Sequence, residues 1–159
     1  MNQDTEFPGW HEISQNSYNP HAWLVGDPII GDDCWIGAFT VIDGSGGLEI
    51  GRGCDISAGA QIYTHSTVRR VISEGAEEIE RRSTRIGDFV HVGAGAVILM
   101  GADIGDHCVV AAGAVVTQGT IATPFSILKG VPAEVHGGAV LNSNENTSDS
   151  LDCSSEEKK

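Results

Sequence analysis

The chain has 159 residues and a formal net charge of −13, with nine Lys and Arg against 22 Asp and Glu. This length fits one domain with a closed core, and the negative charge disfavours nucleic acid and anionic membrane surfaces as partners. The apolar runs fall short of the roughly 18 residues that a membrane helix needs, and the first twenty residues lack a signal-peptide pattern. We therefore expect a soluble, cytoplasmic chain with no membrane insertion, in which residues 1–23 are an N-terminal lead-in.

A six-residue repeat begins at Ile30 and organises the middle of the chain. Every first position is Ile or Val, and the fifth position is small. Residues two apart in a strand share a face, so these positions form a thin inward-facing stripe. Units this short must stack as a solenoid to bury that stripe. The pattern predicts an all-β solenoid over residues 24–121. The twelve hexads read IGDDCW, IGAFTV, IDGSGG and, after a slip of two residues, IGRGCD, ISAGAQ, IYTHST, then IGDFVH, VGAGAV, ILMGAD, IGDHCV, VAAGAV, VTQGTI.

The four cysteines show no CxxC and no paired metal-ligand spacing. Cys34, Cys54 and Cys108 each occupy the small fifth position of a hexad. We expect these three to pack inside as small apolar residues. Cys153 lies in the C-terminal tail.

The hexad IYTHST, residues 62–67, carries His65 at a position that is Gly in half of the hexads. The next eighteen residues, 68–85, abandon the repeat and contain five of the nine Lys and Arg residues. A continued register would bury Glu74 and Glu80, and an unpaired buried carboxylate is too costly. We predict that residues 68–85 leave the solenoid as one protruding loop, and long loops are often functional.

The last part of the chain departs from the repeat again. Residues 122–138 contain two prolines and are predicted to cap the last coil or to swing away from it. Residues 139–159 are polar and acidic, with too little apolar content to fold, so a disordered tail is expected.

The hexads, the segment IYTH before a loop, the return as IGDFVHVGAGAVI and the closing AAGAVVTQGTIATPFSILKGVPAEV resemble the left-handed parallel β-helix acyltransferases. The similarity covers roughly residues 24 to 136 and is greatest to the short sugar O-acetyltransferases, which include maltose and galactoside acetyltransferases. The resemblance implies a left-handed coil, a homotrimer and acetyl-CoA bound between neighbouring prisms. It also implies a sugar or nucleotide-linked sugar as acceptor, with no metal.

The same resemblance places a catalytic base at His65. A neutral imidazole can take the proton of a hydroxyl as the hydroxyl attacks a thioester, and can later return it to the leaving thiolate. Tyr63, in the same motif, and Asp43, in IDGSGG, are candidates for acceptor binding. Asp43 could instead orient the second imidazole nitrogen, or be a residue tolerated at a tight bend.

Two further candidates are Arg69 and Arg70, which follow His65 closely. Arginine suits bidentate contacts with phosphate, so both could bind an anionic acceptor such as a nucleotide diphosphate sugar. The competing interpretation is ion pairing within the loop. The carboxylates available there are Glu74, Glu77, Glu78 and Glu80.

Residues that match CoA contacts in the similar proteins lie in the later hexads. They are Ala94, Ala112, Thr117 and Gln118, although Ala94 and Ala112 also fit the plain repeat consensus. Gln118 and Glu134 stand where basic residues are common, so Lys129 or an arginine of the loop would have to supply the phosphate contacts. His91 stands where Trp is common, and solvation on the outside is expected for it.

Three alternatives stay open. The chain could acetylate the amine of a nucleotide-linked amino sugar. It could be a zinc hydratase like the γ carbonic anhydrases, with His65, His91 and His107 as ligands from adjacent chains, but the HxxxxH pair of those proteins is missing. It could also be a non-catalytic solenoid, which would need neither the histidine nor the basic loop.

Overall fold

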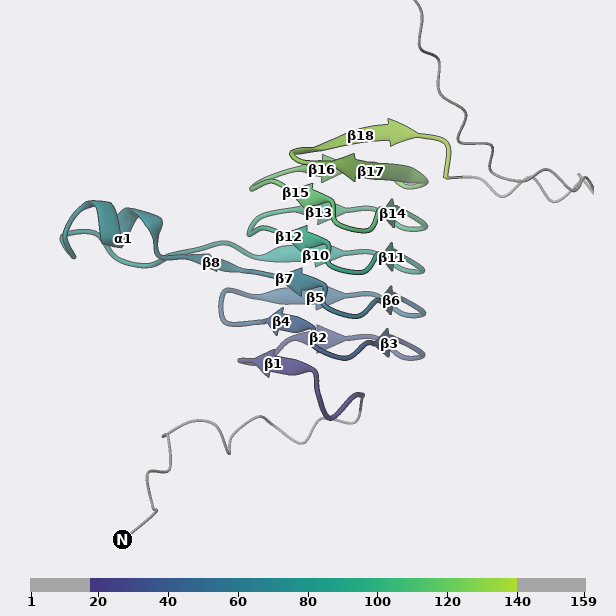
Figure 1. Ribbon diagram of the computed structural model, residues 1–159, viewed down its shortest axis with the longest axis horizontal. Coiled ribbons are helices and arrows are strands. Elements are labelled where there is room, and N and C mark those ends of the chain that lie inside the picture. The colour runs from purple at the N-terminus through teal and green to yellow at the C-terminus, as the bar shows by residue number, and fades with distance from the viewer. Residues whose placement is uncertain (1–17, 140–159) are drawn as a thin grey trace, which may run out of the picture.

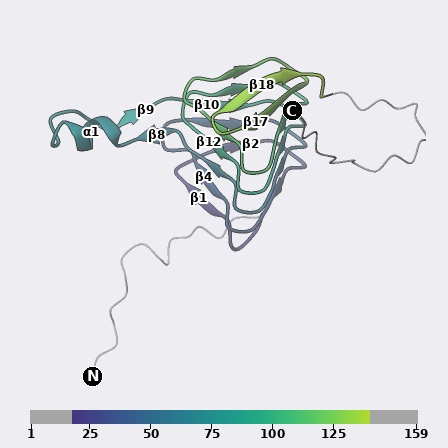
Figure 2. The same cartoon turned by 45° about the horizontal axis from the view of Figure 1, so that its top comes forward.

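The computed structural model describes residues 18–139, which wind into a prism of short strands (Figure 1). Each turn of the chain contributes one strand to each of three faces, and neighbouring strands of a face pair in parallel except for the last pair of the third face. The view in Figure 2 looks more nearly along the prism and shows its triangular outline. The fold is the predicted left-handed parallel β-helix, which departs from the usual right-handed crossover.

Each face is one sheet. The first face contains β1 (Trp23–Val25), β4 (Val41–Asp43), β7 (Gln61–Ile62), β12 (Val97–Ile98) and β15 (Val115–Val116). The second face contains β2 (Ile29–Ile30), β5 (Leu48–Ile50), β10 (Thr84–Ile86), β13 (Asp103–Ile104) and β16 (Ile121–Ala122). The third face contains β3 (Trp35–Ile36), β6 (Asp55–Ile56), β11 (His91–Val92), β14 (Val109–Val110), β17 (Ser126–Gly130) and β18 (Ala133–Gly137).

The register follows the hexads. Val97 pairs with Val115, eighteen residues later, so three hexads make one coil. Ile30 pairs with Ile50, twenty residues later, because this coil takes up the two-residue slip. The slip therefore leaves the stacking intact and only enlarges one corner of the prism.

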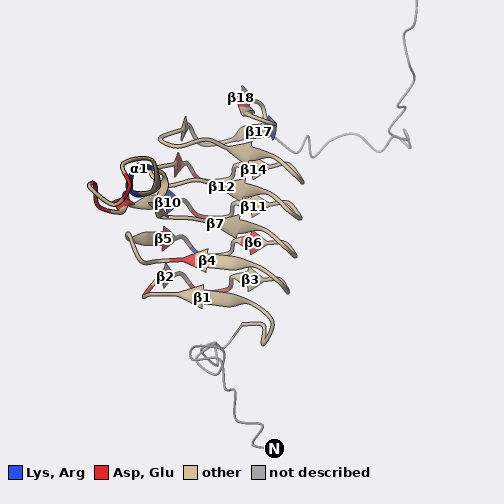
Figure 3. Ribbon diagram, turned by 60° about the vertical axis from the view of Figure 1, so that its left-hand side comes forward, with Lys and Arg blue, Asp and Glu red and all other residues tan. Residues whose placement is uncertain are grey.

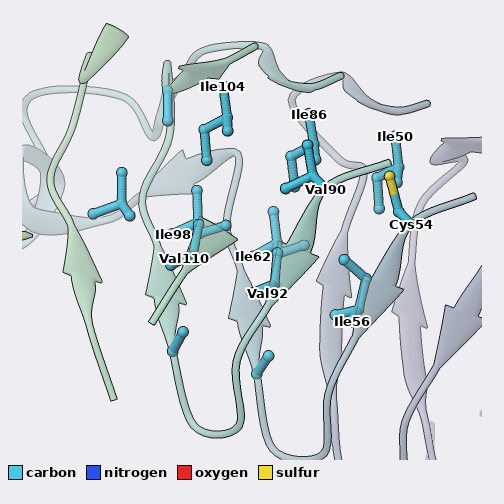
Figure 4. Close-up of a cluster of buried hydrophobic side chains, with 14 of the residues drawn as sticks. Ile50, Cys54, Ile56, Ile62, Ile86, Val90, Val92, Ile98, Ile104 and Val110 are labelled. Atoms are coloured by element: carbon cyan, nitrogen blue, oxygen red, sulfur yellow. The ribbon is translucent and has the colours of Figure 1, made fainter. Parts of the chain in front are cut away.

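The core is the predicted stripe of aliphatic and small residues. Ile56, Ile62 and Ile98 occupy first positions and are fully buried, and Ala60 and Ala96 occupy fifth positions and are equally buried. Figure 4 shows side chains of this kind stacked from coil to coil. Because each layer holds one aliphatic and one small residue per face, the interior is filled without a wide cavity.

The expectation that cysteines pack inside is confirmed for two of the three in the described range. Cys54 and Cys108 are buried, and their thiols donate to the carbonyl oxygens of Gly87 (3.1 Å) and Thr123 (3.2 Å). Burial raises the pKa of the Cys54 thiol to about 11, so this group stays a neutral packing residue. Cys34 is half-buried, and Cys153 lies outside the described residues.

Residues 65–81 protrude from the prism as an arm (Figures 1 and 2). The arm consists of β8 (His65–Ser66), the helix α1 (Val68–Ile72) and β9 (Glu80–Arg81), which pairs with β8 in antiparallel orientation. The predicted loop 68–85 thus has regular structure, and its last residues belong to the prism because Thr84 is buried in β10. Within residues 18–139 the only helix is α1, which is far too short to cross a membrane.

The ends of the prism differ from the predicted boundaries. The first strand begins at Trp23, one residue early, and residues 1–17 lie outside the described range. At the other end, β17 continues the third face, with Leu128 fully buried and paired with Val110, and β18 folds back antiparallel to it. Of the predicted tail, Ala139 donates its N–H to the carbonyl oxygen of Phe125, and residues 140–159 are not described.

Candidate active site at the base of the arm

His65 lies where the arm leaves the prism. The preceding strand β7 ends at Ile62, whose full burial anchors the chain to the core. Three residues later His65 opens β8, and its side chain is 35% exposed. The imidazole therefore stands on a fixed base while one edge of the ring reaches solvent.

The second ring nitrogen is held by a buried carboxylate. Asp43 ends β4 in the preceding coil and is 1% exposed, and its Oδ2 lies 2.6 Å from His65 Nδ1. Oδ2 also accepts the backbone N–H of Thr64 at 2.9 Å, and Oδ1 accepts the N–H of Ser45 at 2.9 Å. Of the interpretations given for Asp43, its burial and its contact with His65 Nδ1 favour the orienting role over direct acceptor binding.

Asp43 is ionised despite its burial. Burial by itself would raise the pKa of this carboxyl, but hydrogen bonds from Ser45, Thr64 and His65 outweigh it and hold the pKa well below its usual range. An ionised carboxylate can only accept, so Nδ1 of His65 must carry the proton that lies between them. In the neutral ring, Nε2 is then the free base.

The two-residue slip in the repeat builds this arrangement. The enlarged corner between β4 and β5, residues 44–47, carries Ser45 Oγ to 3.3 Å from His65 Nδ1. Gly46 donates its N–H to Thr64 Oγ1 at 2.8 Å, and a Cβ at Gly46 would collide with the backbone oxygen of Thr64. Ser45 and Thr64 were missed in the sequence, although the slip itself marked this corner as different from the others.

A groove of about 400 Å³ opens beside His65. It is lined by Tyr63, His65, Ser66, Thr67, Val68, Leu99, Met100 and Gln118. Tyr63 is half-buried, and its hydroxyl donates to Gln61 Oε1 at 2.7 Å. Nε2 of His65 has no hydrogen-bond partner among residues 18–139, so it is available to a molecule in the groove.

The predicted CoA residues fall into two groups. Gln118 lies in the groove with His65, and Thr117 precedes it directly. Ala94 and Ala112 are exposed at the corner where the chain enters β12 and β15, at the other end of these strands. Lys129 is exposed in β17.

Leu99 and Met100 are lining residues that the sequence reasoning missed. Ile62 pairs with Ile98, so the hexads IYTHST and ILMGAD lie on consecutive coils at this corner. This neighbourhood could have been predicted from the sequence. The interrupting segment, residues 68–85, has eighteen residues, the length of one full coil, so the hexads on either side of it keep the register of the prism.

The two predicted anion-binding arginines differ in their ion pairing. Arg69 lies 3.5 Å from Glu77 and 3.7 Å from Glu80, as the competing interpretation proposed. Arg70 is exposed and has no carboxylate within ion-pair distance in the described range. Figure 3 shows both charge signs on the arm, so much of its basic character is neutralised locally.

The other two histidines considered as zinc ligands are engaged elsewhere. His91 Nδ1 lies 3.3 Å from Asp55 on the third face. His107 is stacked between Phe89 and Phe125, with ring centroids 5.2 and 4.8 Å away. Within residues 18–139, no three His, Cys, Asp or Glu side chains come together in a group that could hold a metal ion.

Two family models match the chain. Residues 83–118 match the bacterial transferase hexapeptide, and residues 29–64 match the hexapeptide repeat of succinyl-transferase. Residues 29–64 and 83–118 are thus similar to hexapeptide repeats of transferases. Both matches lie in the prism, and the second ends at Thr64, directly before His65. A comparison with curated proteins found no match to this hexapeptide-repeat chain.

Solved structures of acyltransferases share the fold. A variant of AntD, an N-acyltransferase from Bacillus cereus, in complex with dTDP and coenzyme A is 21% identical with a TM-score of 0.65, covering 76% of this chain and 68% of its own. A maltose O-acetyltransferase from Clostridium difficile 630 is 24% identical with a TM-score of 0.52, covering 74% and 70%. An acetyltransferase from Vibrio cholerae is 27% identical with a TM-score of 0.53, covering 75% and 72%.

Proposed function

We propose that this chain is an acyltransferase that moves the acetyl group of acetyl-CoA to a sugar hydroxyl, with His65 as general base. The observation that carries the proposal is the pair of Asp43 and His65 beside an open groove, with Nδ1 bound to the carboxylate and Nε2 free. A hydroxyl keeps its proton at neutral pH, and a positioned neutral imidazole removes this obstacle.

The reaction needs no covalent enzyme intermediate. The acceptor oxygen attacks the thioester carbonyl while Nε2 of His65 takes the hydroxyl proton. The new C–O bond forms, the C–S bond breaks, and the imidazolium returns its proton to the departing thiolate. The products are an acetyl ester and CoA. Asp43 stabilises the transient imidazolium and keeps the ring in the tautomer that presents Nε2.

Two of the proposed binding residues lie beside His65. Tyr63 and Gln118 share the groove with His65, and we assign Tyr63 to the acceptor and Gln118 with Thr117 to the pantetheine arm. Ala94, Ala112 and Lys129 would contact the more distant parts of CoA. The AntD structures contain coenzyme A, which supports a CoA thioester as the donor of a prism of this kind.

An amine acceptor is the second candidate. One AntD variant was crystallised with dTDP-4-amino-4,6-dideoxyglucose and coenzyme A, so a related prism accommodates a nucleotide-linked amino sugar. The same base would serve an amine, because nitrogen must also lose a proton to form a stable amide. An acceptor screen that includes amino sugars, with free CoA as readout, separates the two candidates.

The central test replaces His65 with Ala. We expect kcat to fall by about 10²- to 10⁴-fold, the usual contribution of general base catalysis. His91→Ala is the matched control, because His91 is also exposed and paired with an aspartate but lies on the third face. Its turnover should stay near that of the wild type.

A thermal-shift titration with acetyl-CoA accompanies the turnover measurements. A ligand that binds the native chain raises its melting temperature with occupancy, so the wild type and both variants should shift alike. An unimpaired His65→Ala variant would overturn the role of His65. The absence of any shift in the wild type at saturating acetyl-CoA would favour a non-catalytic solenoid.

A further inference from the structure

The arm places an arginine opposite the proposed base. In the antiparallel pair of β8 and β9, His65 is opposite Arg81, and Ser66 is opposite Glu80. Directly opposed residues of such a pair project from the same side of the ribbon, with Cβ atoms about 5 Å apart, and adjacent residues project from opposite sides. Arg81 therefore shares a side with His65, and Glu80 faces the other way.

The carboxylates of the arm do not neutralise Arg81. Glu80 lies 2.9 Å from Arg82 and 3.7 Å from Arg69. Arg81 is exposed, and among residues 18–139 it has no carboxylate within ion-pair distance. Arg70 shares this property, whereas the other arginines of the described range pair with carboxylates, as Arg85 does with Asp103 (3.3 Å).

The position of Arg81 restricts what it can bind. Its partner across the ribbon is His65, the residue that would take the acceptor proton, so a ligand of Arg81 would lie on the same side of the ribbon as the proposed base. The phosphates of CoA are separated from the thioester by the whole pantetheine arm, which is longer than an arginine side chain. An anion within reach of Arg81 therefore belongs to the acceptor.

We propose that Arg81 binds an anionic group of the acceptor, a carboxylate or a phosphate, and so selects acidic acceptors. The inference rests on the proposed function and adds the acceptor class to it. A guanidinium forms two parallel hydrogen bonds with either group, which fixes orientation as well as charge. The proposal therefore assigns anion binding to Arg81, opposite His65, and not to Arg69, which is paired with Glu77 and Glu80.

The test compares acceptors that share a ring and differ in charge: glucose, glucuronate, glucose 6-phosphate and UDP-glucose. The wild type should have a higher kcat/KM for the charged acceptors. Arg81→Gln should raise KM for the charged acceptors by about 10- to 100-fold, the loss of one charged hydrogen-bond contact. Its kcat and its KM for glucose should not change. Arg81→Lys should restore part of the loss, and Arg85→Gln, an exposed arginine on the second face, should have no effect.

Each contrary outcome has a separate meaning. Acetyl transfer without preference for charge, or an equal loss for charged and neutral acceptors in Arg81→Gln, overturns the role of Arg81 and leaves the proposed function standing. The absence of transfer to any acceptor overturns the proposed function itself. If Arg81→Gln raises KM for acetyl-CoA but not for acetylpantetheine, the anion belongs to the donor and the inference is wrong.

Discussion

A carboxylate with 1% exposure is costly unless its oxygens are fully hydrogen-bonded, and Asp43 meets this condition. All of its partners come from the corner that carries His65. Asp43 therefore stabilises that corner and also holds the imidazole of His65 in one tautomer.

Replacing Asp43 with Asn tests the second role. The amide cannot hold the imidazole in the same tautomer or balance the imidazolium, so kcat should fall by about 10²-fold. KM for acetyl-CoA should change little, because Asp43 does not line the groove. Steady-state kinetics at pH 7 measure both values, and an unchanged kcat would contradict the role.

The same variant has an expected pH signature in unfolding. Folding lowers the pKa of Asp43, so its stabilisation is complete above about pH 4 and is lost as the pH falls below that value. Asp43→Asn should be less stable than the wild type by about 1 to 3 kcal/mol at pH 7. Urea unfolding from pH 7 to pH 3 should show this difference shrinking only at the acidic end.

Some of these residue roles were predictable from the sequence. His65 stood out because it interrupts a strict repeat in front of a long insertion. Ser45, Thr64 and Arg81 did not stand out, since their importance comes from contacts across a corner or across the ribbon. No local pattern announces a pairing between residues sixteen or twenty positions apart.

At the scale of the strand, stability depends on the inward first position. Ile98 in β12 is fully buried between Ile62 and Val116 on the neighbouring coils. Replacing it with Ala should cost about 2 to 5 kcal/mol of unfolding free energy, because the narrow core cannot collapse around the cavity. Val97→Ala, at the outward neighbour, should cost about 1 kcal/mol or less. Urea unfolding of both variants measures the contrast, and equal costs would contradict the strand orientation.

The arm shows where strand-level prediction stops. The costly burial of Glu74 and Glu80 correctly excluded residues around them from the prism. The repeat held no information about α1 or the ribbon of β8 and β9, whose register depends on the two strands meeting outside the prism. That register decides which arginine stands opposite His65.

At the scale of the whole molecule, the first coil exposes large apolar side chains on all three faces. Trp23, Ile29 and Trp35 are 55%, 65% and 64% exposed, one on each face. Such exposure is typical of surfaces that bind another chain. Together with the resemblance to trimeric acyltransferases, it leads us to propose a homotrimer.

Sedimentation equilibrium should therefore give three times the chain mass of 16.7 kDa. If acetyl-CoA binds between neighbouring prisms, turnover per chain should fall on dilution below the concentration at which the trimer dissociates. A monomer with full activity would contradict this proposal.

The sequence alone determined the solenoid, its inward residues and the singular histidine. Each of these follows from short-range periodicity, because a strand exposes alternate faces whatever lies beyond it. Only the tertiary structure decided that Asp43 supports His65, that Leu99 and Met100 line the groove, and that Arg81 stands across the ribbon. These contacts join residues from different coils or from the two strands of the arm, and stacking and strand register bring them together rather than any local pattern.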